Sequence, residues 1–71
     1  MSLSKEDKLS IIDQHIRNVE YSIYGSELDL IEAQAVESPD TVSIASINNR
    51  ITAATAKKTA LLTERTEVES E

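Results

Sequence analysis

The stretch Glu37-Ser38-Pro39-Asp40-Thr41 lies near the midpoint of a chain of 71 residues and separates two long segments of helical periodicity. Proline has a φ fixed near the helical value and no N–H, which suits the first position of a helix. Ser38 is then expected to be the N-cap residue, because its hydroxyl can accept from the free amides of the next turn. The residue before a proline is disfavoured in the α region, so the preceding helix should end at about Glu37. The stretch therefore predicts a turn between two helices.

Apolar side chains recur in alternating steps of three and four on both sides of this turn, which is the pattern of a coiled-coil seam. Before the turn the series is Leu9, Ile12, Ile16, Val19, Ile23, Ser26, Leu30 and Ala33. After the turn the series is Ile44, Ile47, Ile51, Ala54, Lys58, Leu61, Arg65 and Val68. If the chain folds back at the turn, every position of the first series faces one of the second in a single register, with Leu9 opposite Val68 at the far end. The sequence thus predicts an antiparallel pair of helices.

The chain is expected to form a single all-α domain over residues 1–71, a two-helix antiparallel hairpin. Ser4 and Asp7 have the spacing of a capping box, so the first helix should begin there. Acidic residues near a helix C-terminus interact unfavourably with its dipole, so the end of the chain should fray. The expected elements are a first helix over about 5–37, a turn at 38–40, a second helix over about 39–68 and a frayed acidic tail at 69–71.

Gly25 interrupts the first helical segment and, with Ser26 after it, could mark a helix end followed by a capped restart. A glycine within a helix costs only about 1 kcal/mol relative to alanine. A break, by contrast, would put every later seam position out of phase. We therefore predict one continuous helix of about 33 residues, roughly 50 Å long, with a kink at Gly25 as the alternative.

The composition limits the classes of function. The chain has 13 acidic and 7 basic residues and a formal charge of -6, and because nucleic-acid binding draws on clustered Lys and Arg, binding to DNA or RNA is not expected. It has no cysteine, which excludes disulfides and thiolate metal sites. No apolar run approaches the roughly 20 residues of a membrane span, and the first residues lack the apolar region of a signal peptide. We therefore expect a soluble, cytoplasmic protein without membrane contact.

His15 is the only histidine of the chain. The predicted register places it beside Glu64, and Asp29 beside Arg50, as flanking charged pairs. A zinc site would need His15, Asp13 and Glu64 to meet at one end of the hairpin, and an exposed flanking residue is the preferred interpretation. The serines and threonines have no base near them other than His15, and a slender hairpin offers no concave pocket. We predict no enzymatic activity, no catalytic residue, no metal and no cofactor.

Two further stripes of side chains are expected outside the seam. The tyrosine stripe lies on the first helix, roughly 150° from the seam at 100° per residue, and consists of Tyr21, Tyr24, Leu28, Ile31 and Ala35. The alanine stripe lies on the second helix, also turned away from the seam, and consists of Ser46, Asn49, Ala53, Ala56, Ala60 and Thr63. Contiguous exposed apolar patches usually mark contacts. We predict an interface formed by the tyrosine stripe and by Ala53, Ala56 and Ala60. The alternative is that the alanines are helix formers on a solvated face and that the tyrosines are partly exposed.

An isolated two-helix hairpin of this length is marginally stable, so the leading hypothesis is self-association, most simply a homodimer of two hairpins that forms a four-helix bundle. The function would then be that of a non-enzymatic structural or assembly component. The alternative is an acidic protein-binding module or inhibitor that docks on a larger partner through the tyrosine stripe. RNA binding by an assembled bundle is a third hypothesis, which the missing basic face disfavours.

Helix-forming residues make up the stretches Asp7-Lys8-Leu9, Gln14-His15-Ile16, Asn18-Val19-Glu20-Tyr21 and Glu27-Leu28, with Ile12 among them and the proline turn after them. Over the half of the chain that precedes the turn, this sequence resembles short uncharacterised open reading frames of marine tailed phages. The resemblance implies a helical hairpin of similar length without an assigned activity. It implies no catalytic or binding residue.

Overall fold

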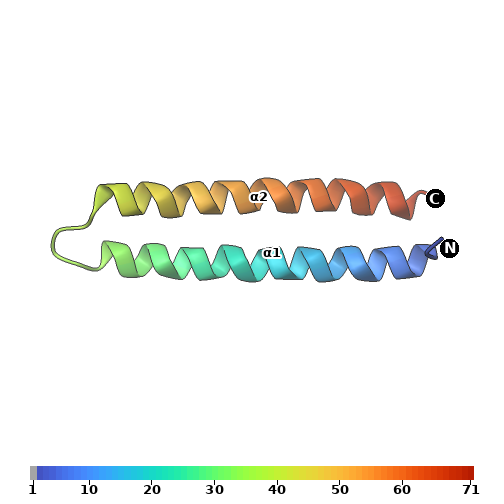
Figure 1. Ribbon diagram of the computed structural model, residues 1–71, viewed down its shortest axis with the longest axis horizontal. Helices are drawn as coiled ribbons and strands as arrows, with labels where there is room; N and C mark the ends of the chain where they lie inside the picture. The colour runs from blue at the N-terminus through green and yellow to red at the C-terminus, as the bar shows by residue number, and fades with distance from the viewer. Residues whose placement is uncertain (1) are drawn as a thin grey trace.

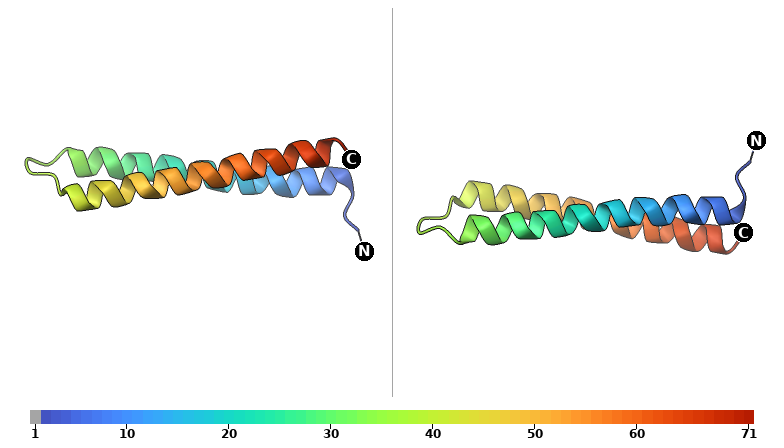
Figure 2. Two further views of the ribbon diagram at one scale, coloured as in Figure 1. Left: turned by 90° about the horizontal axis from the view of Figure 1, so that it is seen from above. Right: turned by 90° about the horizontal axis from the view of Figure 1, so that it is seen from below.

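The computed structural model describes residues 2–71 and consists of two long helices joined by a link (Figure 1). The helices are α1 (Lys5–Gln34) and α2 (Thr41–Glu69), and the described range contains no strand. They pack side by side and antiparallel along their length and cross at a shallow angle (Figure 2). The hairpin measures 55 × 18 × 14 Å. The prediction of an all-α helical hairpin is confirmed for these residues, and residue 1 of the predicted domain lies outside them.

The contact between the helices follows the predicted seam. With the exception of Lys8, every side chain of residues 2–71 that is at least half-buried belongs to one of the two heptad series. Ile47 and Val68 are buried, with 8% and 2% of their surface exposed, and Ser26 is the buried polar member. The other seam side chains remain half-buried, because a lone pair of helices covers the seam from two sides only. The periodicity therefore predicts the core position by position, and the hairpin by itself leaves much of that core near water.

Ion pairs between the two helices show the antiparallel register directly. Within the described residues the pairs are Lys8–Glu71 (3.1 Å), Asp13–Arg65 (2.7 Å), Glu20–Lys58 (3.2 Å) and Asp29–Arg50 (3.3 Å). As the α1 member advances along the chain, the α2 member recedes by nearly the same number of residues. The predicted contact of Asp29 with Arg50 is confirmed, and the pairs agree with the predicted layers to within the reach of the side chains.

The beginning and the middle of α1 agree with the prediction. The Asp7 N–H donates to the Ser4 hydroxyl at 3.1 Å, so Ser4 is the N-cap. The helix then passes through Gly25 without a break. A Cβ added at Gly25 would meet no atom within 4 Å. The hairpin therefore tolerates glycine at this position but does not require it.

The link between the helices is longer than predicted. The first helix ends at Gln34 and not at about Glu37, and α2 begins at Thr41. Pro39 consequently lies in the link and not in the first turn of α2. The axes of packed helices lie about 8–10 Å apart, and non-helical residues are needed to cross that distance.

Asp40, and not Ser38, is the N-cap of α2. Its carboxylate accepts from the Val42 N–H at 3.0 Å and from the Ser43 hydroxyl at 2.9 Å. A charged acceptor is favoured over a neutral hydroxyl at the positive end of a helix dipole, so the cap falls on the aspartate. The hydrogen bonds from the Ser43 hydroxyl, and then from the Val42 and Ser43 amides, hold the pKa of Asp40 below its ordinary value.

The acidic end of α2 carries two ion pairs that were not predicted, and the fraying of residues 69–71 stays a prediction. Glu69 is still part of α2. Its carboxylate pairs with Arg65, and Glu71 pairs with Lys8 of α1 at 3.1 Å. Each pair places positive charge beside an acidic side chain and so offsets the repulsion from the carbonyl end of the helix dipole.

Candidate interaction surface

The tyrosine stripe lies on the side of α1 that faces away from α2. Its large members are among the exposed apolar side chains of the described residues, with 65% of Tyr21, 62% of Tyr24, 41% of Leu28 and 62% of Ile31 accessible. Ala35 follows the last turn of α1 as its C-cap and is also exposed. The hairpin thus leaves the whole predicted stripe uncovered, over the half of α1 next to the link.

Tyr21 is held by a neighbour within α1. Arg17 Nε donates to Tyr21 Oη at 3.2 Å, and Arg17 Cζ lies 5.8 Å from the centre of the ring. The two residues are one helical turn apart, where side chains meet, and a guanidinium is attracted by an aromatic face. The bond to the tyrosine hydroxyl is the largest cause of a pKa of Arg17 above its ordinary value. This contact was not predicted, although the spacing of the two residues in the sequence was a visible signal.

Two shallow hollows distinguish the broad faces of the hairpin. The Glu20 face is defined by a hollow lined by Glu20, Ile23, Tyr24, Glu27 and Lys58. The His15 face is defined by a hollow lined by His15, Val19, Lys57, Ala60, Leu61 and Glu64. Since the seam lies between these hollows, Tyr24 and Ala60 belong to opposite faces.

The alanine stripe is exposed along the outer side of α2. Ala53, Ala56 and Ala60 are all exposed, and the hydroxyl of Thr63 donates to the Thr59 carbonyl at 3.1 Å. Because the backbone engages that hydroxyl, the methyl group is the part of Thr63 left for a partner. The structure therefore confirms that both stripes are open, and it places them on opposite edges of the hairpin. One hairpin cannot bring them together on a single side.

Other threonines of α2 use their hydroxyls as Thr63 does. Thr55, Thr59 and Thr66 each donate to the carbonyl four residues earlier, at 2.8 to 3.1 Å. Such bonds satisfy the hydroxyl within the helix. These threonines consequently present methyl groups along α2 and offer a ligand little free hydrogen-bonding capacity.

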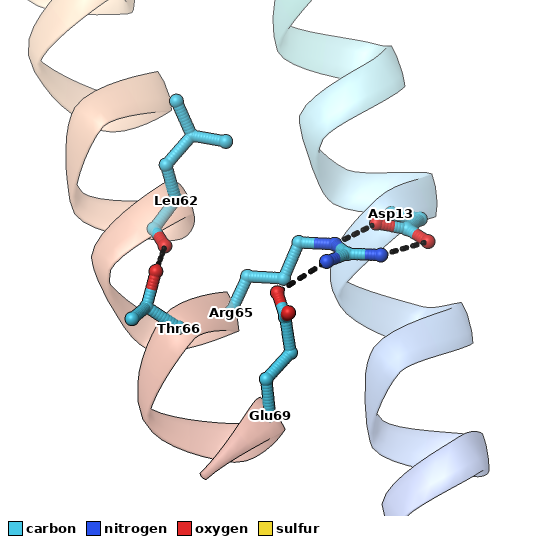
Figure 3. A network of polar contacts seen from close by, with 5 residues as sticks. All are labelled: Asp13, Leu62, Arg65, Thr66 and Glu69. Carbon is cyan, nitrogen blue, oxygen red and sulfur yellow. Dashed lines mark hydrogen bonds and ion pairs between the residues drawn. The ribbon is translucent and has the colours of Figure 1, made fainter.

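Charged seam residues on the Glu20 face join the two helices. Arg65 lies between Asp13 of α1 and Glu69 of α2 and donates to both (Figure 3). Its guanidinium lowers the pKa of Asp13, and Asp13 in turn raises that of Arg65. Lys58, one heptad earlier, reaches Glu20 in the same way. Long side chains of this kind keep their stems in the seam and their charges in water, so they fix the register of the hairpin.

The candidate zinc ligands do not come together. His15 and Glu64 line one hollow of the His15 face, as the register predicts. Asp13 lies on the Glu20 face and is bound to Arg65. Within residues 2–71, no three carboxylate or imidazole side chains are arranged to hold a metal ion.

Further exposed apolar side chains lie outside the predicted stripes. The most exposed is Val42, with 75% of its surface accessible, and the others include Ile11, Val36 and Leu62. Val42 precedes Asn49 by one heptad, so it lies on the same side of α2 as the alanine stripe. The predicted stripe begins at Ser46 and does not include Val42, although the spacing of Val42 was a visible signal.

Comparison of the chain with protein-family models, with curated proteins and with solved structures finds no match. Neither α1 nor α2 is long and apolar enough to cross a membrane. Since unrelated functions share the same folds, a helical hairpin alone defines no activity. Any functional proposal must come from the surfaces described above.

Proposed function

We propose that this protein is a non-enzymatic structural or assembly component that acts in the cytoplasm as a homo-oligomer. The observation that carries the proposal is the open tyrosine stripe, on which Tyr21, Tyr24 and Ile31 each expose more than half of their surface. The stripe is contiguous and lies on the far side of α1 from its own partner helix. Contiguous apolar surface of this kind marks a contact with another molecule.

The small core of the hairpin supports the same proposal. Among the described residues, Ile47 and Val68 are the buried apolar side chains. Small domains without disulfides or metals commonly gain the missing stability from oligomerisation, and this chain has no cysteine. Covering the stripe with a second copy would contribute about 25 cal/mol per Å² of apolar surface removed from water.

The test is sedimentation equilibrium of the wild type and of a Leu28→Glu/Ile31→Glu variant from micromolar to millimolar concentration. We expect the wild-type mass to rise above the 7.8 kDa of one chain, and the variant to stay at that mass, because burying a carboxylate in an apolar contact is strongly unfavourable. An Asn18→Glu/Ser22→Glu variant adds the same charge to exposed positions on another side of α1 and should associate as the wild type does.

A wild type that stays monomeric over the whole range would overturn the proposal and leave docking on a larger partner as the use of the stripe. Association that survives the Leu28→Glu/Ile31→Glu change would overturn the assignment of the stripe. Circular dichroism of each variant shows whether the hairpin itself is intact.

A further inference from the structure

The two stripes of the hairpin overlap in height over most of their length, where height means position along the long axis. The ion pairs Glu20–Lys58 and Asp29–Arg50 fix the register of α1 against α2 in this region. In that register each member of the tyrosine stripe has a counterpart on the outer side of α2. The counterparts are Tyr21 with Ala56, Tyr24 with Ala53, Leu28 with Asn49, Ile31 with Ser46 and Ala35 with Val42.

Side-chain sizes at these heights are complementary. Where the edge formed by α1 carries tyrosine, leucine or isoleucine, the edge formed by α2 carries alanine, serine or asparagine. The relation reverses at the end next to the link. There α1 carries the small residue, Ala35, and α2 carries the larger one, the exposed Val42. Packing between helices requires that large groups face small ones. The two edges of one hairpin therefore have the shapes of two surfaces that fit each other.

The directions of the two stripes are also matched. Each stripe points roughly 150° away from the seam at 100° per residue. Tyr24 leans toward the Glu20 face and Ala60 toward the His15 face. The two stripes consequently point in opposite directions. A second copy displaced sideways, without rotation, would place its alanine stripe on the tyrosine stripe of the first.

Charges beside the stripes favour this contact over one between two tyrosine stripes. Next to the tyrosine stripe, on the side of the Glu20 face, lies Glu27. A two-fold contact centred on the tyrosine stripe would set Glu27 against Glu27 of the second copy, and like charges that face each other are destabilising. In the sideways contact the same residue lies at the height of Arg50 of the second copy, and residues 41–63 of α2 include no acidic side chain.

We propose that the hairpins associate side by side, with the tyrosine stripe of one copy on the alanine stripe and Val42 of the next. This inference rests on the proposed function and names the surface that the tyrosine stripe contacts. An interface between two different surfaces, repeated without rotation, does not close on itself. The assembly is then an open row of alternating antiparallel helices and differs from the closed four-helix bundle that the sequence suggested.

The test is a mixing experiment with Leu28→Glu, which blocks the tyrosine stripe, and Ala53→Glu, which blocks the alanine stripe. Each variant keeps one working surface. Each alone should therefore remain at the 7.8 kDa monomer mass, whereas an equimolar mixture should form a species of twice that mass and nothing larger. The wild type should instead grow continuously with concentration. Sedimentation velocity separates these outcomes.

A Ser22→Glu chain mixed with an Asn48→Glu chain serves as the matched control, because both positions are exposed and lie on sides of the helices outside the stripes. This mixture should form open rows as the wild type does. The pair Tyr24→Glu and Ala56→Glu repeats the test at neighbouring exposed positions, should either first variant fail to show the far-UV circular dichroism of the folded hairpin.

The proposal is overturned if Ala53→Glu alone still forms a dimer, since the tyrosine stripe would then contact its own copy. It is equally overturned if the mixture stays monomeric while the wild type associates. In both cases self-association, the proposed function, still stands. A wild type that is monomeric at all concentrations removes both proposals at once.

Discussion

Neither packing nor backbone conformation requires a glycine at position 25. Gly25 lies within α1, has no positive φ, and an added Cβ would meet nothing within 4 Å. Glycine in a helix costs about 1 kcal/mol relative to alanine through lost backbone entropy. We therefore predict that Gly25→Ala raises the free energy of unfolding by about 1 kcal/mol, or the melting temperature by about 4–8 °C.

Urea denaturation followed by circular dichroism measures this change. Ser22→Ala, at an exposed helical position of the same segment, controls for the intrinsic propensity of alanine and should stabilise by less. A Gly25→Ala chain that is less stable than the wild type would show that the hairpin needs the glycine after all.

Asp40 makes the stability of the hairpin depend on pH in the acid range. Hydrogen bonds from Ser43 and Val42 hold its folded-state pKa below the ordinary value of 3.8. A group whose pKa is lower in the folded state contributes stability above its unfolded pKa, and that contribution is lost as the pH falls through the folded pKa. Asp13, whose pKa Arg65 lowers, acts with the same sign. We predict a melting temperature that falls on acidification below about pH 4.

The Asp40→Asn variant separates the contribution of Asp40 to the pH dependence of the melting temperature from that of Asp13. Asparagine is an equally good N-cap but does not ionise in this range. Its melting temperature should fall less steeply with pH than that of the wild type, while Asp13 keeps the slope above zero. Identical slopes for the two proteins would show that the Asp40 carboxylate does not titrate differently in the two states.

At the scale of the helices, the seam separates residues that matter for stability from residues that do not. Ile47 is buried in the seam of α2, whereas Leu62, on the same helix, is 45% exposed. Removing a buried isoleucine side chain typically costs 2–5 kcal/mol, or about the lower end of that range where the site can relax. We predict that Ile47→Ala lowers the free energy of unfolding by about 2 kcal/mol or more.

Leu62→Ala is the matched control and should change stability by about 0.5 kcal/mol or less. Both values come from urea titrations at one protein concentration, because self-association adds to apparent stability. Equal effects of the two changes would mean that the seam assigned from the heptads is not the core.

The helices were predictable from the sequence because their cause is periodic. Alternating steps of three and four put Ile47 and Val68 in the seam, where they are buried. A single antiparallel register of the two series then placed Asp29 beside Arg50. The link was predicted less well, because Ser38 and Asp40 are both good cap residues and the choice depends on charge at the helix end. The ion pair of Glu71 was missed because its partner, Lys8, comes from the other end of the chain.

The candidate surface was predictable as to its members but not as to its geometry. The spacing of Tyr21, Tyr24 and Leu28 shows that they share a side of α1, and they are indeed exposed. That the alanine stripe leans toward the opposite face follows only from the packed hairpin. The contact between the tyrosine stripe of one copy and the alanine stripe of the next involves two molecules, and it stays a prediction.

At the scale of the whole molecule, side-by-side association has a characteristic shape. One hairpin is 55 Å long and 18 Å wide. Because each further copy lies beside the last at the same height, we predict that X-ray scattering shows particles that widen with concentration while their length stays near 55 Å. The Leu28→Glu chain, measured at the same concentrations, should keep the dimensions of a single hairpin. Particles that lengthen would contradict the sideways contact.

The two ends of the hairpin lie together at the end opposite the link (Figure 1). A pulling force applied between them would act across the helices and not along them, so it would load one layer at a time, beginning with Leu9 and Val68. A pair of helices that separates layer by layer resists such a force weakly, since few contacts share the load at any moment. The same pair would resist strongly if it were pulled from the link and from the opposite end, because the helices would then be stretched along their axes. The position of its ends thus makes the hairpin easy to unzip and hard to stretch.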